Sequence, residues 1–138
     1  MSNGKNYKDV LREYFLNKPE VLCIYIFGSV AKEKEHLYSD IDIAALYDNS
    51  VLPSEYTENQ VALSVELSQL LNKNVDVVIL NRASPYLKFQ IIREGFRVYE
   101  SKNRKDRSFE AHSIIEYFDF LPIKNLLETS MIKRLKEA

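Results

Sequence analysis

The strongest constraint on the fold is an alternation of short apolar runs with longer segments that have helical spacing. Residues 21–27, 40–47 and 75–80 are rich in β-branched and aromatic side chains, which is typical of buried strands. A fourth short strand is expected at 96–99, directly after Gly95. Because strands that alternate with helices pack as one covered sheet, we expect an α/β (α+β) fold with a small mixed sheet of about four strands.

Apolar residues at helical spacing, together with start and stop signals, predict the helices. The chain has 138 residues, the size of one domain, so 1–138 is expected to form a single domain with its core at about 1–100. A helical extension is expected at about 104–136, and Pro122 should divide it into two helices. The helical segments are 7–16, 55–71, 84–93, 104–120 and 123–136.

Two aspartates, Asp40 and Asp42, open the second apolar run, although aspartate is depleted in strands. Side chains alternate between the faces of a strand, so both carboxylates point to the same side. At about 5 Å and an effective dielectric of about 20, they repel each other by roughly 3 kcal/mol. Mg²⁺ offsets such repulsion, because it prefers oxygen ligands and completes its shell with water and substrate phosphates. We therefore predict that Asp40 and Asp42 are metal ligands.

A third carboxylate, Asp76, alternates with Val75 and Val77 in the third apolar run. If this strand lies beside 40–47, three carboxylates converge. Such a cluster can hold two metal ions for an in-line displacement at phosphorus. We therefore expect catalysis at Asp40, Asp42 and Asp76, with two Mg²⁺ ions.

A phosphate-binding turn is expected at Gly28-Ser29, directly after the first strand. Glycine lets backbone amides approach a phosphate closely, and the start of a following helix favours anions. Gly-Ser alone is a weak signal, and D-x-D alone is a moderate one. Their combination with a later strand aspartate is much more specific.

The segment GSVAKEKEHLYSDIDIA resembles the G-S-x10-D-x-D signature of the polymerase-β-like nucleotidyltransferases. It is most similar to the minimal, MNT-type members, many of which are antitoxins that act beside HEPN-domain toxins. The resemblance extends over VDVVIL, IIREGFRVYE and EYFDFLP, and so covers nearly the whole chain.

This resemblance implies that Gly28 and Ser29 hold the triphosphate of ATP, that Asp40 and Asp42 bind metal, and that Asp76 is the third carboxylate and base. It also implies an AMP transfer to a hydroxyl group, with a tyrosine of a cognate HEPN toxin as acceptor. Minimal members commonly have Ala-Arg-Gly where this chain has Ala-Lys-Glu. Lys32 can still meet a phosphate, but without the two-pronged geometry of arginine.

Two other functions stay open at this point. The chain could be a non-catalytic antitoxin that neutralises its toxin by binding alone. It could also be a small-molecule adenylyltransferase resembling the aminoglycoside-modifying enzymes, although those usually carry an additional helical domain for the acceptor.

Charge and composition bear on partners and location. The net charge of −1 gives no general attraction to nucleic acid, so direct nucleic-acid binding is not expected. The single cysteine, the polar N-terminus and the shortness of the apolar run 21–27 predict a cytoplasmic protein without a membrane segment. The apolar residues of 104–136 could form a homodimer or a partner interface. Basic side chains at Arg93, Arg97, Arg104, Lys105 and Arg107 are expected to steer an acidic or phosphate-bearing partner.

Overall fold

The computed structural model describes residues 6–28 and 40–137. Each segment expected to be a strand is a strand, and the first three expected helices lie within a residue or two of their predicted bounds. The helices are α1 (Tyr7–Phe15), α2 (Tyr56–Leu71), α3 (Pro85–Glu94) and α4 (Asp106–Glu137), with short 3-10 turns at η1 (Pro53–Glu55) and η2 (Leu80–Arg82). The strands are β1 (Val21–Phe27), β2 (Ile41–Tyr47), β3 (Val75–Ile79) and β4 (Phe96–Glu100).

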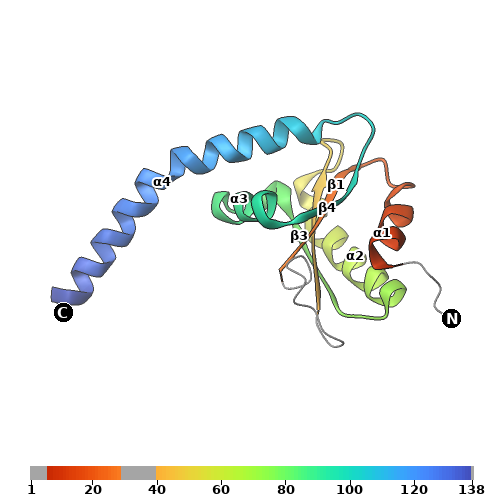
Figure 1. Ribbon diagram of the computed structural model, residues 1–138, viewed down its shortest axis with the longest axis horizontal. Coiled ribbons are helices and arrows are strands. Elements are labelled where there is room, and N and C mark those ends of the chain that lie inside the picture. Colours follow the sequence, from red (N-terminus) through yellow and green to blue (C-terminus); the bar gives the residue numbers. More distant parts are fainter. Residues whose placement is uncertain (1–5, 29–39, 138) are drawn as a thin grey trace.

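The four strands of the described part form one mixed sheet in the order β3-β2-β1-β4, which confirms the predicted fold class. β1 runs antiparallel to both of its neighbours, β2 and β4. β2 and β3 are parallel, and α2 connects them across one face of the sheet. The parallel pair therefore begins at the same edge of the sheet, the edge at which β1 ends (Figure 1).

Each face of the sheet has its own apolar core. On one face, α1 and α2 cover the alternate strand residues that include Ile24, Ile43 and Val77. On the other face, α3 and the start of α4 cover the intervening residues, among them Tyr25 and Ala44. Apart from an irregularity of β1 at Leu22 and Cys23, strand side chains alternate between the two faces, and this alternation decides which face each polar strand residue occupies.

Local signals explain where several elements begin and end. The Asn6 side chain accepts a hydrogen bond of 3.0 Å from the Asp9 amide and so caps α1. Ser84 caps α3 in the same way, with Pro85 as its first residue. α2 ends at Asn72, whose φ of 54° is left-handed, a conformation that asparagine tolerates better than most residues.

The C-terminal segment differs from the prediction of two helices. α4 is a single helix that includes Pro122, so the expected break at that residue is wrong. A proline inside a helix removes one backbone hydrogen bond and costs about 3 kcal/mol, but it can leave a bent helix rather than two. Figure 1 shows such a bend, and the second half of α4 projects away from the sheet.

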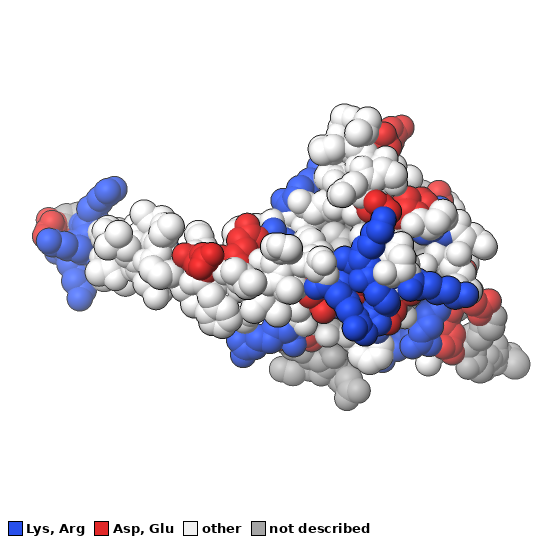
Figure 2. Space-filling model, turned by 90° about the horizontal axis from the view of Figure 1, so that it is seen from above, with Lys and Arg blue, Asp and Glu red and all other residues white. Residues whose placement is uncertain are grey.

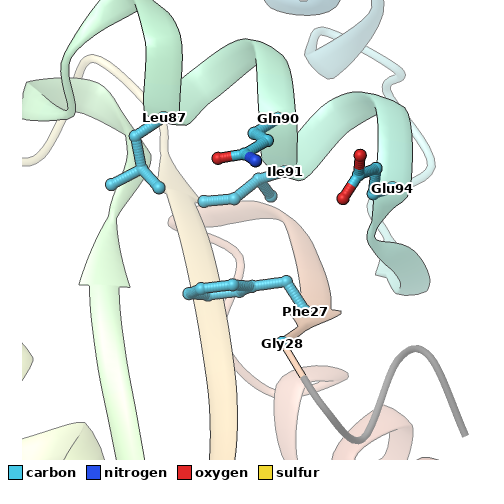
Figure 3. Close-up of a pocket in the computed structure, with 6 residues that line it drawn as sticks. All are labelled: Phe27, Gly28, Leu87, Gln90, Ile91 and Glu94. Atoms are coloured by element: carbon cyan, nitrogen blue, oxygen red, sulfur yellow. The ribbon is translucent and has the colours of Figure 1, made fainter.

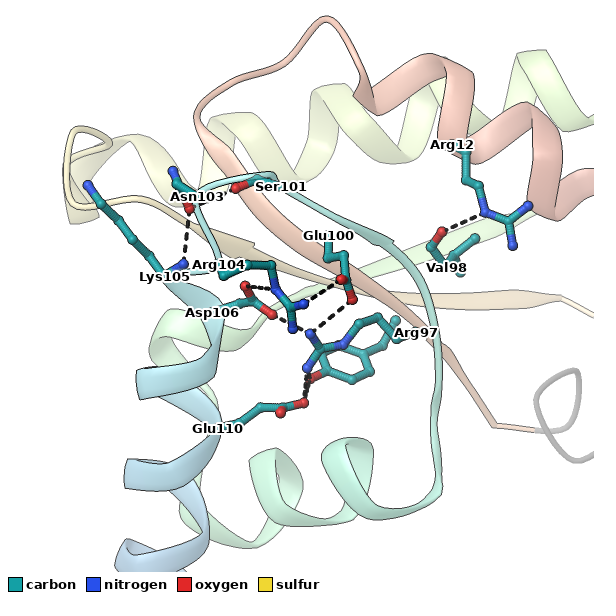
Figure 4. Close-up of polar contacts among 11 residues, drawn as sticks. Arg12, Arg97, Val98, Glu100, Ser101, Asn103, Arg104, Lys105, Asp106 and Glu110 are labelled. Carbon is teal, nitrogen blue, oxygen red and sulfur yellow. Dashed lines mark hydrogen bonds and ion pairs between the residues drawn. The ribbon is translucent and has the colours of Figure 1, made fainter.

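A polar cluster fastens the first turns of α4 to the sheet (Figure 4). The Arg97 guanidinium on β4 contacts the carboxylates of Asp106 and Glu110, and it donates a hydrogen bond of 2.8 Å to the Tyr25 hydroxyl. Asp106 is fully buried, and a buried carboxylate needs a paired cation. Arg104 adds an ion pair of 2.8 Å to Glu100.

This cluster corrects one expectation from the sequence. Arg97 and Arg104 are engaged in ion pairs within the chain, so they are not available to steer a partner. Lys105 lies 3.9 Å from Asp48, while Arg93 and Arg107 are exposed. Among the described residues, no helix is long and apolar enough to cross a membrane.

Candidate active site

The carboxylates of Asp42 and Asp76 come from neighbouring strands. β2 and β3 are parallel, and these two residues are paired in register. Ile41 and Ile43 point into the core beneath α1 and α2, so Asp42 points to the opposite face, which α3 covers. The same alternation places Asp76 on that face. The sequence analysis made convergence of the carboxylates conditional on the third strand lying beside the second, and the structure meets that condition.

The three aspartates differ in their exposure to solvent. Asp42 is half-buried, Asp76 is exposed, and Asp40 is exposed directly before β2 begins. Burial raises the pKa of the Asp42 carboxyl, and the negative charges of Asp76 and Asp40 raise it further. The structure thus keeps like charges together at one edge of the sheet, an arrangement that a bound cation would stabilise.

Gly28 lies against this group of carboxylates. Its φ of 77° is left-handed, and a Cβ atom there would collide with the Asp42 carboxylate. Any other residue would be strained twice, by its backbone conformation and by this contact. The glycine predicted for close backbone approach is therefore required by geometry. Ser29 and Lys32, the other two residues predicted to bind nucleotide, lie outside the described residues.

The fit of these residues to a divalent cation can be judged from their chemistry. Within residues 6–28 and 40–137, no three His, Cys, Asp or Glu side chains group tightly enough to form a complete metal centre. Mg²⁺ does not need one, because it is commonly held by one or two carboxylates together with water and substrate phosphates. The oxygen donors of Asp42 and Asp76, and the raised pKa of Asp42, fit such an open site.

A pocket of about 170 Å³ opens beside Gly28, between the end of β1 and α3. Figure 3 shows the Phe27 ring forming one side, while side chains of α3 point toward it from the other. Sequence reasoning did not identify this pocket. Its residues are ordinary for a strand and a helix, and only the packing of α3 over β1 brings them together. Its lining is Phe27, Gly28, Leu87, Gln90, Ile91 and Glu94.

Comparisons with known proteins agree with this geometry. The family model described as polymerase beta, nucleotidyltransferase matches residues 9–104, which include both strand carboxylates and Gly28. The chain is 32% identical over 103 residues to the protein adenylyltransferase MntA of Shewanella oneidensis. That match covers 73% of this chain and 69% of the relative.

Solved structures with the same fold come from toxin–antitoxin complexes. A chain of a toxin–antitoxin crystal structure with AMP-PNP superposes with a TM-score of 0.75 at 25% identity, covering 93% of this chain and 99% of that one. A second neighbour is a structure of a tri-AMPylated HEPN toxin of Shewanella oneidensis in complex with its MNT antitoxin. It superposes with a TM-score of 0.69 at 23% identity, covering 91% and 95% of the two chains, and shows the fold alone.

Proposed function

Since the chain belongs to the polymerase beta nucleotidyltransferase family, we propose that it transfers AMP from ATP to a hydroxyl group of a partner protein. The acceptor in this proposal is a tyrosine of a HEPN toxin, and the chain is the antitoxin. The observation that carries the proposal is the in-register pair of Asp42 and Asp76 beside Gly28. The resemblance to a protein adenylyltransferase over 73% of the chain supports the choice of acceptor class.

The three aspartates share one role in this reaction, and Asp76 has a second one. Asp40, Asp42 and Asp76 would hold divalent metal, with two Mg²⁺ ions as the expected number. Bound Mg²⁺ supplies positive charge that stabilises the phosphates and the leaving pyrophosphate. Asp76 is exposed and lies opposite Asp42, so its carboxylate can accept the proton of an incoming hydroxyl. The hydroxyl oxygen then bonds to the α-phosphorus as the bond to pyrophosphate breaks.

The nucleotide is held from the side of β1. Gly28 brings backbone close to Asp42, and in this proposal the phosphates bind there. Ser29 would add a hydroxyl donor, and Lys32 a positive charge. These assignments derive from the sequence pattern and stay predictions.

The second half of α4 offers a surface for the partner. Its large apolar side chains are more than half exposed, and Figure 2 shows uncharged surface along this arm, with charged side chains gathered at its tip. A helix with so much apolar surface is poorly stable alone in water and gains stability when a partner covers it. We assign this surface to the toxin, with a homodimer as the other use. Its exposed apolar residues are Ile123, Leu126, Leu127, Met131, Ile132 and Leu135.

Two further statements belong to the same proposal. The protein would act in the cytoplasm, in keeping with Cys23, a free and buried thiol. It would not contact nucleic acid directly, because its net charge is −1.

The test is transfer of label from α-labelled ATP to a purified HEPN toxin. Label should appear on a tyrosine, require Mg²⁺, and disappear with Asp76→Asn. Full neutralisation of the toxin without label would instead identify an antitoxin that acts by binding alone. Label on an aminoglycoside but not on the protein would identify a small-molecule enzyme.

A further inference from the structure

The pocket between β1 and α3 lies on the face of the sheet that carries the candidate catalytic carboxylates. Phe27 is paired with Asp42 across β1 and β2. Gly28 lines the pocket and also abuts the Asp42 carboxylate, so it joins the two sites directly. A molecule bound with its phosphates at Asp42 would therefore have the pocket within reach of its other end.

The lining has the chemistry of a site for a flat, mostly apolar group. The Phe27 ring forms one wall, and Leu87 and Ile91 face it from α3 (Figure 3). The Gln90 amide points into the same space, and within the described residues no hydrogen bond occupies it. Rings stack on aromatic faces, and a glutamine amide can form two hydrogen bonds with the edge of adenine.

We infer that this pocket holds the purine base of the nucleotide and that Gln90 gives it a preference for adenine. The inference rests on the proposed function only for the nature of the substrate, a nucleoside triphosphate. Phe27 supplies stacking, the aliphatic residues of α3 cover the opposite face of the base, and Gln90 contacts its amino edge. Gly28 then lies between the base pocket and the site of the phosphates.

Two other occupants can be compared with a purine base. Among the described residues that line the pocket, none is a lysine or arginine, so these residues offer no cation to a phosphate group. The tyrosine ring of an acceptor protein would also fit an aromatic slot, but it offers the Gln90 amide a single hydroxyl, whereas adenine offers a donor and an acceptor side by side. Binding measurements without any acceptor separate these cases.

The experiment is calorimetry on the full chain with Mg²⁺ and three ligands. ATP has phosphates, base and amino group, purine riboside triphosphate lacks the amino group, and inorganic tripolyphosphate lacks the nucleoside. The variants are Phe27→Leu and Gln90→Leu. Gln69→Leu, the same change at an exposed position of α2, is the matched control.

Phe27→Leu should weaken ATP binding about tenfold and leave the affinity for tripolyphosphate unchanged, since a base–aromatic stack contributes about 1–3 kcal/mol. Gln90→Leu should weaken ATP about tenfold but leave purine riboside triphosphate nearly unchanged. The effects of removing the Gln90 amide and of removing the adenine amino group on the binding free energy should therefore be non-additive. Thermal unfolding of each variant checks that the fold is retained, and Gln90→Leu tests the inference even if Phe27→Leu unfolds.

The base pocket is overturned if both variants bind ATP as the unaltered chain does, or if the effects of the amide and the amino group simply add. Either result stands apart from the AMP-transfer proposal, because transfer to the toxin is scored separately. A chain that binds adenine in this pocket but transfers nothing would keep the pocket and remove the enzyme. Loss of toxin binding, with unchanged ATP affinity, would assign the slot to the acceptor tyrosine instead.

Discussion

Replacing Asp42 by asparagine should remove AMP transfer and at the same time make the chain more stable. Asparagine keeps the size of the side chain, so packing beside Gly28 is preserved. It removes one of the like charges that β2 and β3 bring together in register. Loss of a metal ligand lowers the activity, whereas relief of the repulsion raises the stability of the fold.

The size of the stability gain follows from the strand geometry. Neighbouring strands lie about 4.8 Å apart, and two unit charges at about 5 Å repel by roughly 3 kcal/mol at an effective dielectric of about 20. Asp76 is exposed, so solvent screens much of this repulsion. We expect a gain of about 1 kcal/mol, which corresponds to a Tm increase of about 3 °C at this chain length.

The gain should depend on pH with a definite sign. The pKa of the Asp42 carboxyl is raised above its ordinary value of 3.8 in the folded chain. The folded state therefore holds this proton more tightly than the unfolded state, and stability falls as pH rises through the interval above 3.8. Asparagine has no such proton. The difference in Tm should be full at neutral pH and vanish under acid conditions, where the Asp42 carboxyl is protonated.

Thermal unfolding in EDTA, at several pH values, measures the effect. Asp119→Asn, at an exposed position of α4, is the matched control and should leave Tm unchanged. A second series with Mg²⁺ and ATP should raise the Tm of the unaltered chain but not that of Asp42→Asn. A fall of several degrees for Asp42→Asn at neutral pH, or AMP transfer at the normal rate, would refute the reasoning.

Substitutions at three other places test separate parts of the structure. Gly28→Ala should lower stability by about 1–2 kcal/mol and abolish ATP binding, because the φ at this position is left-handed and the new Cβ would collide with Asp42. Normal ATP affinity in calorimetry would contradict the role of this turn. Arg97→Met should cost about 3–5 kcal/mol in denaturant unfolding, since it leaves Asp106 buried without a cation, whereas exposed Arg107→Met should be nearly neutral. Leu126→Ser and Leu127→Ser should leave the Tm of the isolated chain unchanged but weaken toxin binding at least tenfold in calorimetry. Unchanged toxin binding would show that the partner binds another surface.

The sequence was sufficient to predict the strands, and it singled out the residues on which the proposed chemistry rests. An aspartate within an apolar strand is costly, so Asp42 and Asp76 were conspicuous without any structure. Gly28 was identified because it ends a buried strand. Their approach to one another was only conditional, since it required β3 to pair with β2 in parallel and in this register. β2 and β3 are joined through α2 and not by a tight turn, so no turn geometry in the sequence fixes their register.

The features that were missed or wrong share a physical cause. Arg97 looks like any surface arginine in the sequence, and its partners Asp106 and Glu110 become evident only when α4 crosses the sheet. Pro122 predicts a break from local rules, yet the helix continues through it. The Phe27–Gln90 pocket joins a strand and a helix that are distant in the chain, so only the fold could show it.

Intact-mass spectrometry of the HEPN partner tests the central claim most directly. The HEPN partner is co-expressed either with the unaltered chain or with Asp42→Asn. Its mass is compared with that of a catalytically inactive variant of the same partner, expressed without this chain. The account predicts added AMP units with the unaltered chain and none with Asp42→Asn. An unmodified partner that is nevertheless fully neutralised by both forms would contradict it.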